Sequence, residues 1–191
     1  MKTLSFRPFA ALSAITFFVL MSIYSCGTGS GVSEQDKIKR GEYLVTTVGC
    51  GDCHSPKVMT EQGPQEDRMR LLSGHPAAEV PPEIPSEVLS PTGWVAVTNG
   101  HLTAWGGPWG ISYATNLTPD DLTGIGAWTE DAFIKAMRNG KHLGTGRPIL
   151  PPMPWANLSK MTDEDLGSIF TYLKSIRPVR NQVPQPIPPK G

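Results

Sequence analysis

The chain of 191 residues is poor in cysteine. It has three, of which two lie three positions apart and the third stands alone near the start. A structural zinc site needs four Cys or His ligands at short spacing, and no second Cys-x-x-Cys pair is present. The net charge is zero, with 17 Lys and Arg against 17 Asp and Glu. Without a basic stripe, nothing suggests nucleic acid as a partner.

Internal repeats and catalytic constellations are also missing. No group of residues is arranged for general acid/base or nucleophilic work, so the chain is not expected to be an enzyme. Helix breakers, in contrast, are abundant, with 20 Gly and 19 Pro. This composition predicts short helices joined by long irregular loops.

The most informative motif is Cys50-Gly51-Asp52-Cys53-His54. Two thiols at this spacing can form thioethers with the two vinyl groups of a haem, and the following imidazole can bind its iron. A redox Cys-x-x-Cys pair would be expected at a helix start in a βαβ context, which is missing here. The single motif therefore predicts one covalently bound haem c, with Cys50, Cys53 and His54 as its attachment and iron-binding residues.

Residues 1–25 are typical of a signal peptide. Lys2 and Arg7 precede an apolar run from about Phe9 to Ile23, which is too short and too early for a transmembrane span. Cys26 follows directly, and the Gly- and Ser-rich stretch after it is typical of a bacterial lipoprotein site, which predicts a lipidated tether over 26–35. We expect an exported, periplasm-facing, membrane-anchored lipoprotein. The alternative is an ordinary signal peptide and a soluble periplasmic protein.

The mature chain is expected to form one domain over 36–178. Hydrophobic spacing and capping residues predict helices over 34–48, 128–139 and 162–175. An irregular insert is expected over 56–115, with a β-hairpin that turns at Asn99-Gly100. The Pro-rich tail over 179–191 is expected to be extended or disordered.

The remaining iron ligand is predicted to be Met153. Three prolines at 151, 152 and 154 stiffen its segment, which lowers the entropic cost of holding a weak thioether ligand. Thioether ligation also raises the reduction potential. Other methionines and histidines stay open as alternatives: Met59, Met69, Met137, Met161, His75, His101 and His142.

Several motifs together resemble the class I c-type cytochromes. The chain is similar in particular to single-haem domains related to the cytochrome subunits of periplasmic alcohol and gluconate dehydrogenases. The matching segments are 40–44, 50–54, 116–120, 124–129, 152–154 and 171–175. The resemblance implies an all-α, cytochrome c-like fold around one haem. The segment between His54 and Asn116 is about twice as long as a minimal member needs.

The resemblance also implies roles for individual residues. Gly41 on the first helix would let Tyr172 on the last approach closely. Trp128 and Asn116 would donate to a haem propionate, although plain core packing and turn formation, respectively, explain them as well. Pro64 would supply the carbonyl that fixes the histidine tautomer. Apolar haem contacts are expected from Leu117, Ile125, Phe133 and Leu150.

These features together predict electron transfer by one haem c that cycles between ferric and ferrous states, in a membrane-tethered carrier or a cytochrome subunit of a larger complex. The expected partners are a dehydrogenase as donor and an oxidase or another cytochrome as acceptor. The alternative is a haem enzyme or gas sensor with a displaceable sixth ligand. Trp94, Trp105 and Trp109 in the insert form either a docking face or a small packed cluster.

Overall fold

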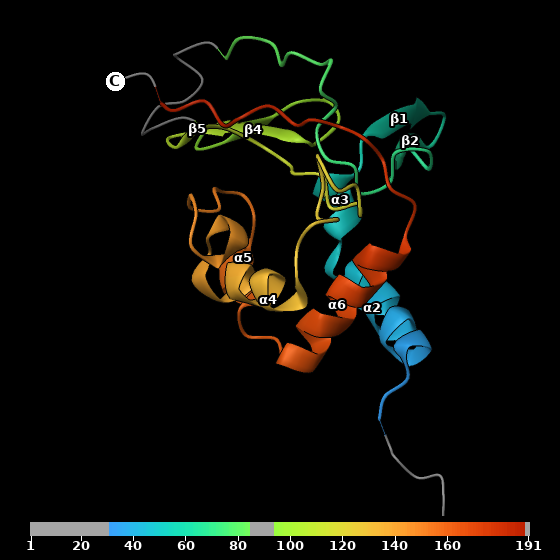
Figure 1. The fold of residues 1–191 in the computed structure, drawn as a ribbon. Coiled ribbons are helices and arrows are strands. Elements are labelled where there is room, and N and C mark those ends of the chain that lie inside the picture. Colours follow the sequence, from blue (N-terminus) through green and yellow to red (C-terminus); the bar gives the residue numbers. More distant parts are fainter. Residues whose placement is uncertain (1–30, 85–93, 190–191) are drawn as a thin grey trace, which may run out of the picture. The chain divides into compact units, whose positions relative to one another are not determined.

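Two crossing helices organise the domain. A computed structural model describes residues 31–84 and 94–189, in which α2 (Glu34–Val48) packs against α6 (Asp163–Ser175) (Figure 1). A Cβ atom on Gly41 would lie 2.0 Å from the carbonyl oxygen of Ser168 and 2.6 Å from Cβ of Tyr172. The crossing thus requires a residue without a side chain, which confirms the predicted approach of Tyr172 to Gly41.

Local capping explains where the long helices begin. Ser33, Thr129 and Thr162 each accept a hydrogen bond from the backbone N–H three residues later. The helices predicted over 34–48 and 162–175 are therefore confirmed to within a residue, and α4 (Glu130–Asn139) begins two residues later than predicted. Gly140 ends α4 in the left-handed conformation that glycine adopts without strain.

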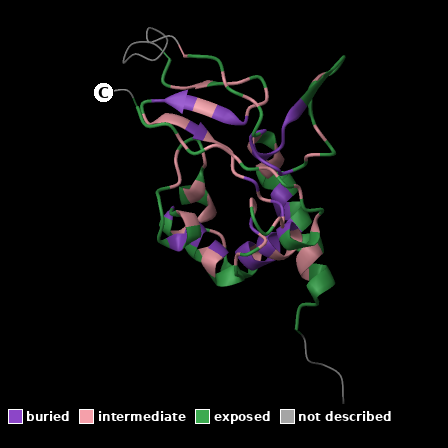
Figure 2. Cartoon of the chain, turned by 45° about the horizontal axis from the view of Figure 1, so that its top comes forward, coloured by how far each residue is buried: buried purple, intermediate pink, exposed green. Residues whose placement is uncertain are grey.

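The core lies where α2, α4 and α6 meet. Figure 2 shows their buried faces turned toward one another. The rings of Phe133 and Phe170 lie 5.5 Å apart and join α4 to α6. Among the described residues, three short helices complete the helical part: α3 (Cys50–His54), η1 (His142–Gly144) and α5 (Trp155–Leu158).

The prediction of an all-α fold is wrong. The described chain also holds a two-stranded antiparallel sheet and a three-stranded one. The first pairs β1 (Lys57–Thr60) with β2 (Gly63–Glu66), and the second pairs β4 (Ala104–Gly107) with β3 (Val97–Thr98) and with β5 (Gly110–Tyr113). Strands of two to four residues are too short to show an alternating pattern, so the Gly- and Pro-rich composition indicates irregular loop instead.

The predicted hairpin is present with a longer loop. Val97 and Thr98 pair with Gly106 and Trp105, so the chain reverses over residues 99–103 rather than at a two-residue turn. The side-chain oxygen of Asn99 accepts from the backbone N–H groups of Thr103 and Ala104. This side chain satisfies the loop's donors and stabilises the wider reversal.

The tail is extended and is held against the domain. The amide nitrogen of Asn181 donates to the carbonyl oxygens of Ser73 and His75, at 2.7 and 2.8 Å. Further along, Ile187 exchanges two backbone hydrogen bonds with Ile111 of β5. In Figure 1 the tail, drawn in red, runs beside β4 and β5.

Part of the predicted organisation lies outside the described residues. This applies to the signal peptide (1–25), to Cys26 and the rest of the first half of the tether (26–30 of 26–35), and to residues 85–93 of the insert. Across the described ranges, no helix has both the length and the apolar character to cross a membrane.

The close helix crossing predicts that Gly41→Ala destabilises the protein. The added Cβ would overlap backbone and Cβ atoms of α6, which cannot move independently, so we expect a loss of about 1–3 kcal/mol in the free energy of unfolding. Urea unfolding of the holoprotein measures it. Gly100→Ala is the matched control, because its Cβ would meet nothing within 4 Å. Equal midpoints for the two variants would contradict the prediction.

Candidate haem site

The Cys-x-x-Cys-His motif forms a helix of its own. Gly49 ends α2 with a positive φ of 76° and begins α3, which turns the chain sharply before Cys50. Residues three apart share a helix face, so the two thiols lie on the same side of α3. Both cysteines are free and half buried, and burial raises the pKa of the Cys50 thiol to about 11.

His54 is buried, and its orientation is fixed by one hydrogen bond. Its Nδ1 lies 2.8 Å from the carbonyl oxygen of Thr115, and a carbonyl can only accept, so Nδ1 carries the hydrogen. Burial lowers the pKa of His54 and favours the neutral imidazole. In that tautomer the lone pair lies on Nε2, which suits an iron ligand.

The expectation that Pro64 supplies this carbonyl is wrong. Pro64 is exposed on β2, and the acceptor is Thr115, at the far end of the insert. No signal in the sequence marked Thr115 for this role, because the contact spans 61 residues.

Lys57 caps the motif helix. Its ammonium donates to the carbonyl oxygens of Gly51, Asp52 and Ser55, at 2.9, 2.9 and 2.7 Å. Gly51 and Asp52 belong to α3 and Ser55 directly follows it, so one ammonium satisfies three carbonyl oxygens around the end of this helix. Only 7% of Lys57 is exposed, and burial lowers the pKa of its amine. Sequence reasoning missed this residue, because a lysine after a short motif looks like an ordinary surface charge.

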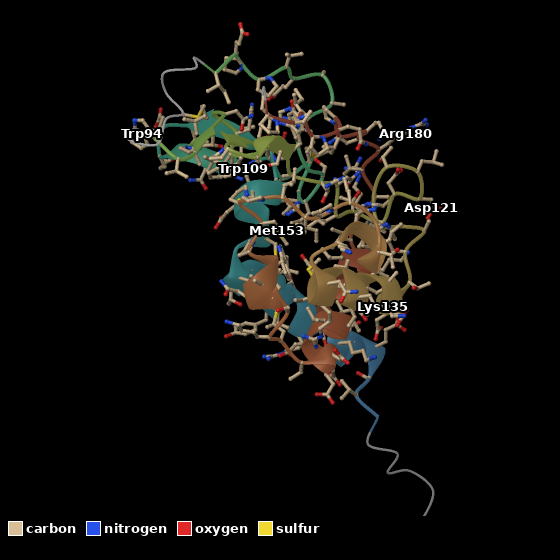
Figure 3. All side chains as sticks on the ribbon, turned by 90° about the vertical axis from the view of Figure 1, so that its left-hand side faces the viewer. Trp94, Trp109, Asp121, Lys135, Met153 and Arg180 are labelled. Atoms are coloured by element: carbon tan, nitrogen blue, oxygen red, sulfur yellow. The ribbon has the colours of Figure 1, made fainter. Side chains whose placement is uncertain are left out.

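One pocket brings the two predicted iron ligands together. Its lining includes His54 and Cys53 from the motif and Met153 from the proline-rich loop. Figure 3 shows Met153 between the strands, drawn above it, and the helices, drawn below it. The four residues expected to make apolar contacts also line this pocket: Leu117, Ile125, Phe133 and Leu150.

Trp128 and Asn116 line the same pocket in different ways. The Trp128 ring meets the imidazole of His142 edge-on, with centroids 5.0 Å apart. The amide nitrogen of Asn116 donates to the carbonyl oxygen of Val179 and the hydroxyl of Thr123, so both its hydrogens have protein partners. Its side-chain oxygen accepts from the backbone N–H of Thr118, two residues later, which is the contact of a turn-forming Asn. The propionate roles of Trp128 and Asn116 stay predictions.

The alternative ligands fall into three groups. Met59 and Met69 are exposed on the surface, by 77% and 65%. His75 and His101 use both ring nitrogens in protein contacts. Met161 packs against the core without lining the pocket, whereas Met137 and His142 do line it.

Two segments far away in the sequence also reach the pocket. The tail contributes residues 182–186, and the insert contributes Trp105 and residues 112–115. The three tryptophans of the insert differ in their surroundings. Trp105 and Trp109 donate indole hydrogen bonds within the sheet region, whereas 72% of Trp94 is exposed. The composition of the insert and the tail predicted irregular structure, but it did not indicate that these segments line a pocket.

A Cys-x-x-Cys-His helix, with a buried histidine that lines one pocket together with a methionine, resembles the site of a c-type cytochrome. The comparisons agree. The gluconate 2-dehydrogenase cytochrome c subunit of Pantoea cypripedii is 28% identical over 88% of this chain and 30% of its own length. The fructose dehydrogenase cytochrome subunit of Gluconobacter japonicus is 26% identical over 95% of this chain and 32% of its own.

Another relative matches a shorter segment of the chain with a higher identity. A nicotinate dehydrogenase subunit from Pseudomonas putida is 42% identical over 40% of this chain and 6% of its own length. No family model matches the chain. The chain spans less than a third of the length of these relatives. The similarity to cytochrome subunits of dehydrogenases confirms the resemblance predicted from the motifs, and it agrees with an electron-carrier subunit rather than a catalytic one.

The three bonds of Lys57 predict that Lys57→Met destabilises the holoprotein. Three carbonyls at the end of the motif helix, of which that of Ser55 makes a buried bond, lose a charged donor, which is typically worth about 1.5–3 kcal/mol in unfolding free energy. Lys135→Met is the control, because Lys135 forms an exposed ion pair with Asp131 that contributes about 0.5 kcal/mol or less. Chemical unfolding compares the two, and an equal loss in both variants would show that Lys57 is an ordinary surface lysine.

Proposed function

We propose that this chain is an electron carrier that binds one haem c covalently. Cys50 and Cys53 would form the thioether bonds, and His54 and Met153 would ligate the iron. The observation that carries the proposal is the buried His54, which directly follows the two thiols, lines the same pocket as Met153 and has its Nδ1 bonded to Thr115. The bound iron supplies one-electron exchange between its ferric and ferrous states.

The residues around the pocket fit this group. The Nδ1–H···O bond to Thr115 leaves the lone pair of His54 on Nε2, where a metal accepts it. Met153 offers a thioether, which favours the reduced iron and raises the potential. Leu117, Ile125 and Phe133 offer apolar side chains to the faces of a macrocycle.

The comparisons support a place for the carrier beside a dehydrogenase. The relatives are named as cytochrome subunits of gluconate, fructose and alcohol dehydrogenases. We therefore propose a dehydrogenase as the electron donor and an oxidase or another cytochrome as the acceptor. Such contacts between redox proteins are small and transient. The single motif in this chain implies that the electron passes on to a different molecule.

The visible spectrum of the haem-loaded protein tests the ligand assignment. The ferric protein should show a methionine-to-iron band, and the ferrous protein should exclude carbon monoxide. Met153→Ala should lose the band, bind carbon monoxide and have a lower potential. Met69→Ala, which removes an exposed methionine, should leave all three unchanged. Ready carbon monoxide binding by the unaltered protein would instead favour a haem enzyme or gas sensor.

The proposed anchor predicts where the protein fractionates. A lipid on Cys26 would keep the exported protein in the membrane pellet, because an acyl chain contributes about 0.8 kcal/mol for each buried CH₂. Cys26→Ser should move it into the soluble periplasmic fraction, with its haem spectrum intact. If the unaltered protein is already soluble, the lipoprotein prediction fails and an ordinary signal peptide remains.

A further inference from the structure

A serine of the insert contacts the loop that carries Met153. Ser112 lies on β5, and only 7% of it is exposed. Its hydroxyl lies 2.5 Å from the carbonyl oxygen of Pro151, across 39 residues of sequence. Its other possible acceptor, the carbonyl oxygen of Trp105, is 3.4 Å away, so the hydroxyl hydrogen points to Pro151.

The hydroxyl is itself oriented by a neighbour. The indole N–H of Trp109 donates to Ser112 Oγ at 3.2 Å, which occupies a lone pair and leaves the hydrogen for Pro151. Trp109 and Ser112 both belong to the insert, whose contacts described so far involve His54 and the pocket wall. They connect it to a carbonyl two residues before Met153.

The methionine loop needs such external support. Prolines at 151, 152 and 154 have no N–H group, so this stretch offers few backbone donors of its own. Its internal bonds are Met153 N–H to the Leu150 oxygen, at 3.3 Å, and Trp155 N–H to the Met153 oxygen, at 2.9 Å. The Ser112 bond is shorter than both, and it comes from outside the loop.

The strand that carries Ser112 is held on both edges. On one edge, β5 pairs with β4 in the register Trp105 to Ser112. On the other, Ile111 and Ile187 of the tail exchange backbone hydrogen bonds of 2.8 and 2.9 Å (Figure 1). Gly110, at φ 90°, makes room for the tail, because a Cβ atom there would lie 2.0 Å from the Ile187 oxygen. Ser112 therefore projects from a fixed support.

We propose that Ser112 is a positioning residue for the sixth ligand. Its hydroxyl fixes the proline-rich loop so that Met153 resists displacement from the iron by an external ligand. This rests on the proposed function, because it requires Met153 to ligate the haem. The insert then serves to hold the ligand loop, through the hydrogen bond from Ser112 to Pro151.

Imidazole competition of the ferric holoprotein tests this role. Ser112→Ala should keep the methionine-to-iron band but bind imidazole up to about ten-fold more tightly, which matches the net strength of one hydrogen bond. Ser112→Thr retains a hydroxyl and should restore the original affinity. Ser175→Ala is the control, because Ser175 is exposed and its hydroxyl donates to the carbonyl oxygen of Tyr172 within its own helix.

The outcomes separate this inference from the proposed function. If Met153→Ala keeps the band, Met153 is not the ligand and the proposed function fails. If Met153→Ala loses the band while Ser112→Ala binds imidazole like the unaltered protein, only the inference on Ser112 is overturned. Should Ser112→Ala not accumulate with haem, Trp109→Phe removes the orienting donor and should tighten imidazole binding in the same direction. An unchanged affinity there would also overturn it.

Discussion

The hydrogen bond from His54 to Thr115 is the constraint on which the arrangement of the pocket depends. It fixes the tautomer of a buried imidazole, and it joins the motif helix to the end of the insert. The next residue, Asn116, continues the connection to the tail through the carbonyl oxygen of Val179. The Thr115 carbonyl therefore sets the orientation of the imidazole, because a buried N–H must find an acceptor, and together with Asn116 it connects three distant segments.

The segments that composition marks as irregular form much of the wall around the pocket. The insert and the tail contain few regular elements, yet they bond to each other at Ile111 and Ile187, and the insert bonds to the methionine loop at Ser112 and Pro151. Hydrogen bonds between individual side chains and backbone groups replace the repeating bonds of helices here. This is how a Gly- and Pro-rich chain encloses an apolar site without long secondary structure.

Local signals in the sequence were reliable where the physics is local. Ser33 and Thr162 cap helices with their own hydroxyls, so the bounds of α2 and α6 were readable within a residue. Gly41 was readable too, since only glycine permits that close a crossing. The short strands could not be predicted in this way, because two to four residues are too few to show an alternating hydrophobic pattern. The all-α prediction failed for this reason.

The sequence by itself determined the chemistry: the spacing of Cys50, Cys53 and His54, the methionine among prolines, and the resemblance to cytochrome subunits. These follow from residue types at short separation, where covalent geometry limits the possibilities. Only the tertiary structure decided which carbonyl holds His54, that Lys57 caps the motif helix, and that Ser112 reaches the methionine loop. Two of these contacts join residues that are tens of positions apart, and the contacts of Lys57 depend on how the chain bends after the motif helix. No pattern of neighbouring residues encodes them.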